Sequence, residues 1–256
     1  MIKYYSNIKS KPIITPKLFL DNYINNAKNF KVSKNILIFF SEENLFGFIK
    51  KNSSKHKFRR VKIFDKWFCL YESAGKQDLS IAYIGFGAPI VSFLIEILIS
   101  LGAKRIITIG SACSINDKLK EGDIILISKS YSSDCVLSHY NTKQEEESDP
   151  ILRNNIMKVL DRNSIDFLIG TSYTTDAIFR ETSHLVDNLR RRDISIIEME
   201  AKVLFDIAKQ KKVKIASLAY ISDCIKGDKW IPSSGYFKDA RQSIFDCAPN
   251  FFKYAQ

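Results

Sequence analysis

The sequence has few of the residues that build metal sites, disulfide frameworks or membrane spans. Its 256 residues include three histidines and five cysteines, and no two cysteines stand in a Cys-x-x-Cys spacing. This count and spacing argue against a zinc site and a disulfide framework, and they fit a reducing compartment. The apolar stretch 90–101 is interrupted by Glu96 and is too short to cross a bilayer. The first 17 residues lack an apolar signal core, so we expect a cytoplasmic protein without metal or membrane contact.

Acidic residues are fewer than basic ones. There are 39 lysines and arginines against 28 aspartates and glutamates, which gives a formal net charge of +11. Such a charge can attract nucleic acid, a membrane surface or an anionic substrate. The basic residues are spread through several separate segments, so we interpret most of them as solvated surface and expect no nucleic-acid partner. Apolar residues make up 45% of the chain, enough for the core of one large α/β domain.

Apolar runs alternate with helical segments along the chain. This order predicts an α/β fold, a single domain with a central mixed, largely parallel sheet flanked by helices. Residues 1–30 are predicted to form an N-terminal arm, with a helix over 16–30, and residues 31–256 the domain. Strands are predicted at 35–40, 61–64, 67–71, 80–84, 105–109, 123–128, 165–171, 194–197 and 214–222. Further helices are predicted at 42–51, 89–101, 151–163, 183–191, 198–211 and 236–254, with loops at 51–60, 142–150 and 227–235.

Two of the predicted strands end in small or acidic residues. Gly110 and Ser111 follow the strand 105–109, and a turn there would point N–H groups and a hydroxyl outward as an anion cradle. Glu198 and Glu200 follow the strand 194–197. The helix dipole alone favours acidic residues in a first helical turn. A carboxylate at the end of a buried strand can also grip the diol of a ribose, and Met199 could then pack against the sugar.

A third strand, 214–222, ends in Ser222 and Asp223. Asp223 could cap a loop, or it could act as a general acid that protonates a leaving base. Partial burial would raise its pKa toward the working range. Cys113 and Cys224 flank this candidate site, and we interpret them as apolar packing because no histidine stands near to activate them. Ligands in α/β sheets bind beyond the carboxyl ends of the strands, so we expect these three strand ends to form one site.

The ordered set of motifs resembles the nucleoside phosphorylase-I superfamily, which comprises purine nucleoside and uridine phosphorylases and related nucleosidases. The motifs are Gly-Phe-Gly-Ala-Pro at 85–89, Ile-Gly-Ser-Ala at 109–112, Leu-Lys-Glu-Gly-Asp-Ile at 119–124, Gly-Thr-Ser-Tyr-Thr-Thr-Asp at 170–176, Glu-Met-Glu-Ala at 198–201 and Ser-Asp at 222–223. The stretch 173–182 looks like a uridine-phosphorylase-like branch in particular. The resemblance covers about residues 35–235.

The resemblance implies cleavage of the N-glycosidic bond of a nucleoside, with phosphate as co-substrate and (deoxy)ribose 1-phosphate and free base as products. It implies that Glu200 binds the 2′- and 3′-hydroxyls, with Met199 under the sugar. It implies that Asp223 assists a purine leaving group and that the ring of Tyr173 lies against the base. Glu198 and Ser222 complete the implied substrate-binding set. The resemblance implies a homo-oligomer and no cofactor.

The implied phosphate cradle departs from the family pattern. Ser111 with Gly110 matches part of it, and Arg180 is a further candidate ligand. Residues 40–44 stand where phosphorylases usually carry a Gly-Asp-Pro-x-Arg loop, and Thr108 stands where many carry an arginine. Loss of two guanidiniums removes bidentate phosphate contacts. Hydrolysis by a nucleosidase and nucleoside binding without catalysis therefore stay open, as does the choice of base, since Asp223 favours a purine and the branch favours uridine.

Overall fold

The computed structural model describes residues 11–23, 31–54, 57–61, 69–74, 78–132, 136, 139–140 and 143–253. The strands are β1 (Asn35–Phe39), β2 (Lys57–Val61), β3 (Cys69–Ala74), β4 (Leu79–Tyr83), β5 (Arg105–Ser114), β6 (Ile124–Tyr131), β7 (Glu145–Glu147), β8 (Leu168–Thr174), β9 (Ile196–Glu198), β10 (Lys214–Lys226) and β11 (Lys229–Ile231). The helices are α1 (Pro16–Tyr23), α2 (Glu42–Asn52), α3 (Ala88–Ser100), α4 (Pro150–Arg162), α5 (Ser183–Arg191), α6 (Ala201–Lys211) and α7 (Phe237–Cys247), with short 3-10 helices η3 (Ile178–Arg180) and η4 (Ala248–Asn250). The predicted strand residues 62–64 and the predicted helical residues 24–30 lie outside the described residues.

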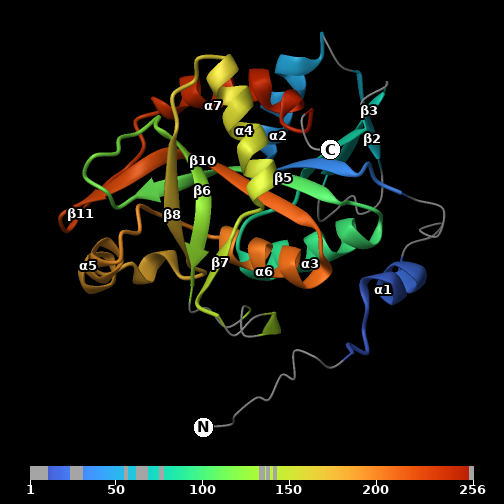
Figure 1. The fold of residues 1–256 in the computed structure, drawn as a ribbon, viewed down its shortest axis with the longest axis horizontal. Helices are drawn as coiled ribbons and strands as arrows, with labels where there is room; N and C mark the ends of the chain where they lie inside the picture. The colour runs from blue at the N-terminus through green and yellow to red at the C-terminus, as the bar shows by residue number, and fades with distance from the viewer. Residues whose placement is uncertain are drawn as a thin grey trace.

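The strands form one mixed sheet, as predicted (Figure 1). Strands β4, β1, β5 and β10 run parallel to one another in that order. Strand β10 also pairs with β6, which pairs with β8, then β9, which returns to β5. These five strands therefore close into a ring, while β1, β4, β3 and β2 extend from it as an open sheet.

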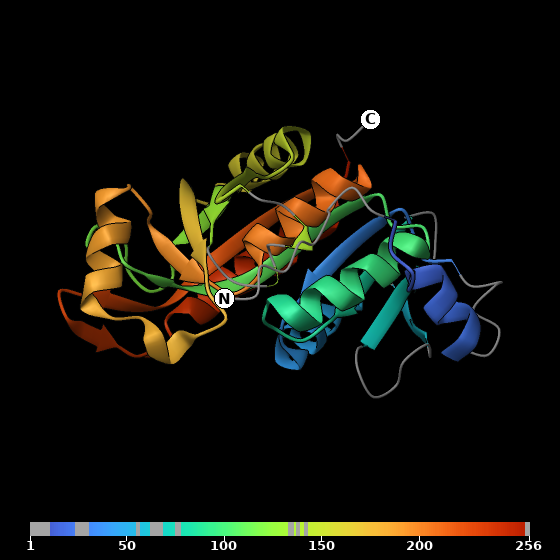
Figure 2. The same ribbon diagram turned by 90° about the horizontal axis from the view of Figure 1, so that it is seen from below.

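Helices cover both faces of the sheet. Strand β1 shows why, because its alternate side chains enter two different cores and all are buried. Ile36 and Ile38 pack with α3 and α6, and Leu37 and Phe39 pack with α2, α4 and α7. A strand that is apolar on both faces has to be covered on both. Figures 1 and 2 show the two helical layers, with α1 at one end of the molecule and α5 at the other.

Several predicted boundaries are wrong because pairing with a neighbouring strand forms or extends strands that the local sequence pattern does not show. Loops were predicted at 51–60, 142–150 and 227–235, and each holds a short strand that pairs with a neighbour. The predicted turn at 110–112 is continuous strand, because β5 pairs with β10 and β9 up to Ser114. The strand predicted at 214–222 likewise runs on to Lys226. The helix predicted to start at Glu198 begins at Ala201, and the C-terminal helix ends at Cys247.

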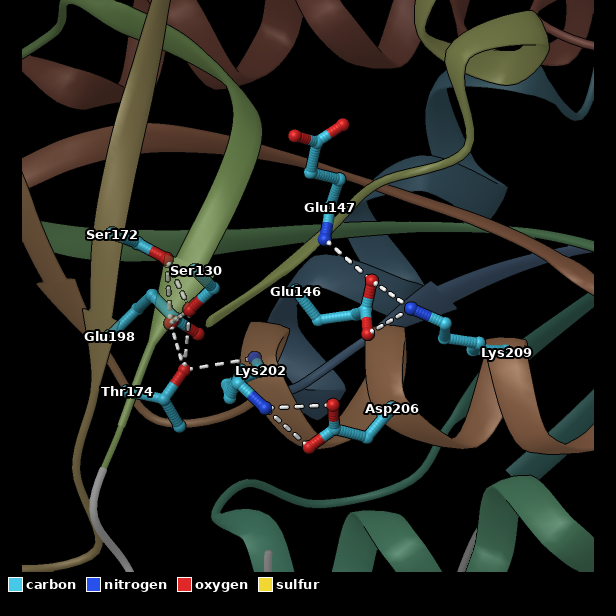
Figure 3. A network of polar contacts seen from close by, with 9 residues as sticks. All are labelled: Ser130, Glu146, Glu147, Ser172, Thr174, Glu198, Lys202, Asp206 and Lys209. Carbon is cyan, nitrogen blue, oxygen red and sulfur yellow. Dashed lines mark hydrogen bonds and ion pairs between the residues drawn. The ribbon is translucent and has the colours of Figure 1, made fainter. Parts of the chain in front are cut away.

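Two of the ion pairs that helix α6 makes lie in contrasting surroundings (Figure 3). Lys202 Nζ lies 2.7 and 2.6 Å from the two oxygens of Asp206, and both side chains are fully buried. Less than one turn beyond Asp206, the more than half exposed Lys209 reaches Glu146 at 2.7 Å. The buried pair can exist only because each charge compensates the other. No helix within the described ranges is both long and apolar enough to span a membrane.

Candidate active site

A cavity of about 600 Å³ opens where β5, β9 and β10 meet. The predicted site residues that line it are Gly110, Ser111, Glu198, Met199, Glu200, Ser222 and Asp223. They come from three segments far apart in the sequence, which the ring of strands brings to one place. The prediction that these strand ends converge therefore agrees with the structure. No group of three or more histidine, cysteine, aspartate or glutamate side chains in the described part of the chain could hold a metal ion.

Two predicted site residues do not line the cavity. Tyr173 pairs with Ile197 of the cavity wall and packs against a cluster that includes Val186 and Leu189 of α5. Arg180 is exposed on η3, although its neighbours Phe179 and Glu181 do line the cavity. Both residues therefore lie next to the cavity, and their contacts with a base or a phosphate stay predictions.

Aromatic side chains that the sequence reasoning did not select surround the opening. They are Phe40, Phe86, Phe179, Tyr220 and Trp230. Phe86, Phe179 and Trp230 are 66%, 96% and 64% exposed. Exposed rings at a cavity mouth are suited to stacking on a planar base. In the sequence, only the glycines on either side of Phe86 indicate a turn at this position. Both adopt positive φ angles, 73° at Gly85 and 90° at Gly87.

Both side-chain oxygens of Glu198 accept hydrogen bonds from other groups of the protein (Figure 3). Its Oε1 accepts hydrogen bonds from Ser172 Oγ at 3.0 Å, from Ser130 Oγ at 3.4 Å and from Thr174 Oγ1. Its Oε2 accepts from the N–H groups of Glu200 and Ala201 at 2.7 and 2.6 Å. The carboxylate therefore holds the start of α6 and fixes the backbone on which Met199 and Glu200 stand. Glu198 also lines the cavity, so its predicted contact with substrate stays a prediction.

Glu200 is buried at the inner end of the cavity. Its Oε1 accepts the N–H of Gly87 at 2.7 Å, at the start of α3. Asp176 accepts the next N–H of that helix, from Ala88, at 2.9 Å. Burial raises the pKa of Glu200 to about 8, and the carboxylates of Glu198 and Asp176 add to the rise while the Gly87 N–H opposes it. Glu200 and Asp176 thus take up the first two N–H groups at the start of α3, which are then not available to bind an anion.

Asp223 reaches the cavity through an irregularity in β10. The register of β10 against β5 shifts between Ile221 and Asp223, so that Ser222 and Asp223 both line the cavity. Asp223 Oδ1 accepts from Ser222 Oγ at 2.6 Å, and Oδ2 accepts from the indole N–H of Trp230 at 2.7 Å. The two donors fix the orientation of the carboxyl group at the cavity wall.

The segment after β11 is held in place by Glu121. This carboxylate accepts from Ser233 Oγ at 2.9 Å and from the N–H groups of Ser234 and Gly235 at 2.9 and 2.8 Å. Desolvation raises the pKa of Glu121, but the hydrogen bonds from Ser234, Ser233 and Gly235 outweigh it and lower the pKa to about 2. The group therefore stays ionised near neutral pH and secures the chain that follows Trp230.

The region predicted to hold phosphate contains hydroxyl and amide groups. Ser41 and Asn44 line the cavity beside Gly110 and Ser111. The Asn44 amide donates to the Tyr220 hydroxyl at 2.9 Å and accepts from buried Arg241 at 3.1 Å. Thr108, which stands where many family members carry an arginine, is buried in the core, and its hydroxyl donates to Ser217 Oγ at 2.8 Å.

We expect Gly110→Ala to destabilise the fold and to disturb this region. A Cβ at Gly110 would lie 2.8 Å from Cδ2 of the Phe40 ring, so the ring has to move. Overpacking of this kind costs about 1–3 kcal/mol. Thermal unfolding should show a lower midpoint, whereas Ser111→Ala, a change at the exposed neighbouring position, should leave the midpoint nearly unchanged. Equal unfolding midpoints for Gly110→Ala and the parent would contradict the packing described here.

The fold and the carboxylate-lined cavity define a class of α/β proteins that includes nucleoside phosphorylases and nucleosidases. A family model described as the phosphorylase superfamily matches residues 36–242. The chain therefore belongs to the phosphorylase superfamily, as its motifs indicate.

Known relatives include both kinds of enzyme. A DeoD-type purine nucleoside phosphorylase of Hahella chejuensis is 28% identical over 181 residues, which cover 68% of this chain and 76% of the relative. The solved structure of Toxoplasma gondii purine nucleoside phosphorylase with immucillin-H has a TM-score of 0.76 at 16% identity, over 86% of this chain and 90% of that one. Uridine phosphorylase of Vibrio fischeri gives 0.73 at 15% identity, over 86% and 92%. The 5′-methylthioadenosine/S-adenosyl homocysteine nucleosidase of Campylobacter jejuni gives 0.68 at 16%, over 86% and 96%.

Proposed function

We propose that this protein cleaves the N-glycosidic bond of a purine nucleoside, with phosphate as the acceptor of the sugar. The observation that carries the proposal is that Glu200 and Asp223 line one cavity. A ribose diol can be bound at the first while its base meets the second. The DeoD-type relative supports a purine and supports phosphate as the acceptor.

Each step of the proposed reaction has a group in this cavity. Glu200 accepts hydrogen bonds from the 2′- and 3′-hydroxyls of the sugar. As the bond from C1′ to N9 breaks, its electron pair moves to the base, and Asp223 donates a proton to N7. Positive charge then develops on the sugar ring, where the carboxylate of Glu200 stabilises it. A phosphate oxygen completes the reaction by forming a bond to C1′.

The phosphate would lie against hydroxyl and amide groups. Ser41, Asn44 and Ser111 supply donors at that end of the cavity. Arg241 lies one side chain behind and polarises the amide of Asn44 through its contact at 3.1 Å. The charge of Arg241 is partly offset by its ion pair with Glu43 at 2.8 Å, so its main contribution to an anion site is to orient the Asn44 amide.

Hydrolysis is the second candidate, and the lining of the cavity favours it. Among the described residues that line the cavity there are four carboxyl side chains, Glu181, Glu198, Glu200 and Asp223, and no lysine, arginine or histidine. A phosphate dianion gains little in such surroundings, whereas a neutral water molecule is not repelled. Water in place of phosphate would yield free ribose from the same bond cleavage.

The acceptor is tested by incubating the protein with adenosine or inosine, with phosphate and in rigorously phosphate-free buffer. Phosphorolysis predicts base release that depends on phosphate, with ribose 1-phosphate as the sugar product. Base release at an unchanged rate without phosphate, with free ribose as the product, would establish hydrolysis. Nucleoside binding without release of base under either condition would instead indicate a binding module.

At a pH above 8, where Glu200 is ionised, we expect Glu200→Gln to lower kcat/KM for a ribonucleoside about 100-fold, because two hydrogen bonds to a charged acceptor become bonds to a neutral one. The loss should be smaller for the 2′-deoxynucleoside, which has one fewer hydroxyl to bind. Because burial holds the pKa of Glu200 at about 8, nucleoside affinity should rise with pH up to that value and then level off. Glu147→Gln, at an exposed position on β7, is the control, and equal losses for both nucleosides would contradict the assignment.

A further inference from the structure

A chain of three hydrogen-bonded side chains leads from helix α7 to the cavity. Arg241 of α7 donates to the side-chain oxygen of Asn44 at 3.1 Å, and the amide nitrogen of Asn44 donates to the hydroxyl of Tyr220 at 2.9 Å. Asn44 lies in the first turn of α2 and Tyr220 in β10, and both line the cavity. All three residues are more than nine-tenths buried. The chain therefore runs from the interior of the protein to the cavity wall.

Arg241 fixes the direction of these hydrogen bonds. A guanidinium group donates and cannot accept, so the atom of Asn44 that faces it has to be the amide oxygen. The amide nitrogen then faces Tyr220, and because this nitrogen is also a donor, the Tyr220 oxygen has to accept. The one proton of the Tyr220 hydroxyl therefore points away from Asn44, toward a third group.

Tyr220 is held in one orientation and keeps its proton. Its ring stacks on that of Phe237 with centroids 5.3 Å apart and an interplanar angle of 9°. The guanidinium of Arg241 lies 5.4 Å from the centroid of the Phe237 ring. Burial raises the pKa of Tyr220, while the hydrogen bond from Asn44 and the charge of Arg241 oppose the rise. The hydroxyl is therefore a neutral donor near neutral pH.

The surroundings of this hydroxyl offer more donors than acceptors. The carboxylate of Glu43 is engaged by Arg241 at 2.8 Å. The Nε–H of Arg241 is buried and finds no acceptor among the described residues. In the sheet, Tyr220 lies opposite Ser111, which also lines the cavity and adds a hydroxyl. Buried donors in a folded protein are normally paired, so this end of the cavity is suited to a ligand that presents oxygen acceptors.

We propose that Tyr220 binds the phosphate acceptor by donating its hydroxyl proton to a phosphate oxygen, and that Arg241 acts through Asn44 as its positioning residue. The inference rests on the proposed function, because it takes phosphate as the acceptor of the sugar. A hydrogen bond to a charged oxygen is stronger than one between neutral groups. A water molecule that attacks the sugar has to lose a proton, and a donor cannot take it up. The donor chain therefore favours phosphate over water at this place.

The test is calorimetric titration of inorganic phosphate into the parent protein, Tyr220→Phe and the control Tyr140→Phe. Tyr220→Phe removes the hydroxyl and keeps the ring that stacks on Phe237. It should weaken phosphate binding about tenfold or more, the usual effect of losing a hydrogen bond to a charged group, and leave adenine binding unchanged. Tyr140→Phe removes a hydroxyl that donates to Glu96 at 2.8 Å, and it should bind phosphate like the parent. Unchanged phosphate affinity in Tyr220→Phe, or an equal loss of phosphate and adenine affinity, would overturn the inference.

Two variants of Arg241 test the positioning role. Arg241→Lys keeps a group that only donates, whereas glutamine can accept as well as donate. In Arg241→Gln the Asn44 amide is free to turn, and Tyr220 can then give its proton to the amide oxygen. Phosphate binding should therefore weaken about tenfold in Arg241→Gln and much less in Arg241→Lys, with adenine binding unchanged in both. Equal phosphate affinities of the two variants would contradict the positioning role.

Binding of phosphate alone separates this inference from the proposed function, because it needs no turnover. Phosphate binding that weakens in Tyr220→Phe and not in Tyr140→Phe supports the inference even if no nucleoside is cleaved. A parent protein that binds no phosphate, either alone or with adenine present, would refute it even if nucleosides are hydrolysed. Thermal unfolding of each variant checks that the fold is retained.

Discussion

Asp223→Asn is expected to lower kcat for purine nucleosides by roughly 10²–10⁴-fold, the usual contribution of a general acid. An amide in place of the carboxyl has no acidic proton to give to N7. It also disturbs the local hydrogen bonds, because Ser222 and Trp230 both donate to Asp223, and an amide group has one acceptor atom where the carboxylate has two. Steady-state rates with adenosine measure the effect directly.

A substrate whose leaving group needs no proton provides the diagnostic comparison. With a p-nitrophenyl riboside, Asp223→Asn should lose less than about tenfold, since a phenolate departs without acid assistance. Asp228→Asn, an exposed change in the turn of the same hairpin, should leave both rates unaltered. Parallel losses on adenosine and on the aryl riboside would show that Asp223 has a structural role and is not the acid.

Lys202→Met should destabilise the fold by about 3–5 kcal/mol, because it removes the ammonium group that lies 2.6 Å from the fully buried carboxylate of Asp206. Denaturant unfolding monitored by fluorescence or circular dichroism should show this as a lower midpoint at an unchanged slope. The pair lies within α6, whose start carries Glu200, so a loosened helix should also weaken nucleoside binding.

The same helix supplies the matched control. Lys209→Met breaks the ion pair between Lys209, which is more than half exposed, and Glu146. It should lower the free energy of unfolding by about 0–1 kcal/mol, the usual contribution of an exposed pair. The double change Lys202→Met with Asp206→Leu should recover most of the stability, because apolar groups then replace both buried charges of the pair. A Lys202→Met protein as stable as the Lys209→Met protein would show that Asp206 finds another partner.

Much of the fold follows from local patterns in the sequence. The continuous apolar run at 35–39 forms β1, and the helices α4 and α5 start and end close to their predicted limits. Their caps are local, since Asp149 and Thr182 accept N–H groups three residues ahead. Convergence of the predicted strand ends could be anticipated because chain order and strand direction decide it.

The details of the site depend on contacts that a sequence does not display. Glu198 and Glu200 are two residues apart, look alike in the sequence and both line the cavity, yet Glu198 accepts hydroxyls of β6 and β8 whereas Glu200 accepts the N–H of Gly87. The hydrogen-bond partners that distinguish Glu198 include Ser172 and Ser130, which lie 26 and 68 residues away along the chain. Glu181 was missed for the same reason, since its neighbour Asp223 lies in a strand that is remote along the chain.

The register shift in β10 controls which side of the strand carries the acid. In a regular strand, consecutive side chains point to opposite sides, so Ser222 and Asp223 could not both face the ligand. The extra residue resets this alternation once, after Ile221. Deleting Ser222 would restore a regular register, with Ile221 opposite Ala112 and Asp223 still opposite Cys113. The strand would keep its acid but lose one of the two donors that orient the carboxyl group, so a single inserted residue supplies the acid with its own hydroxyl neighbour.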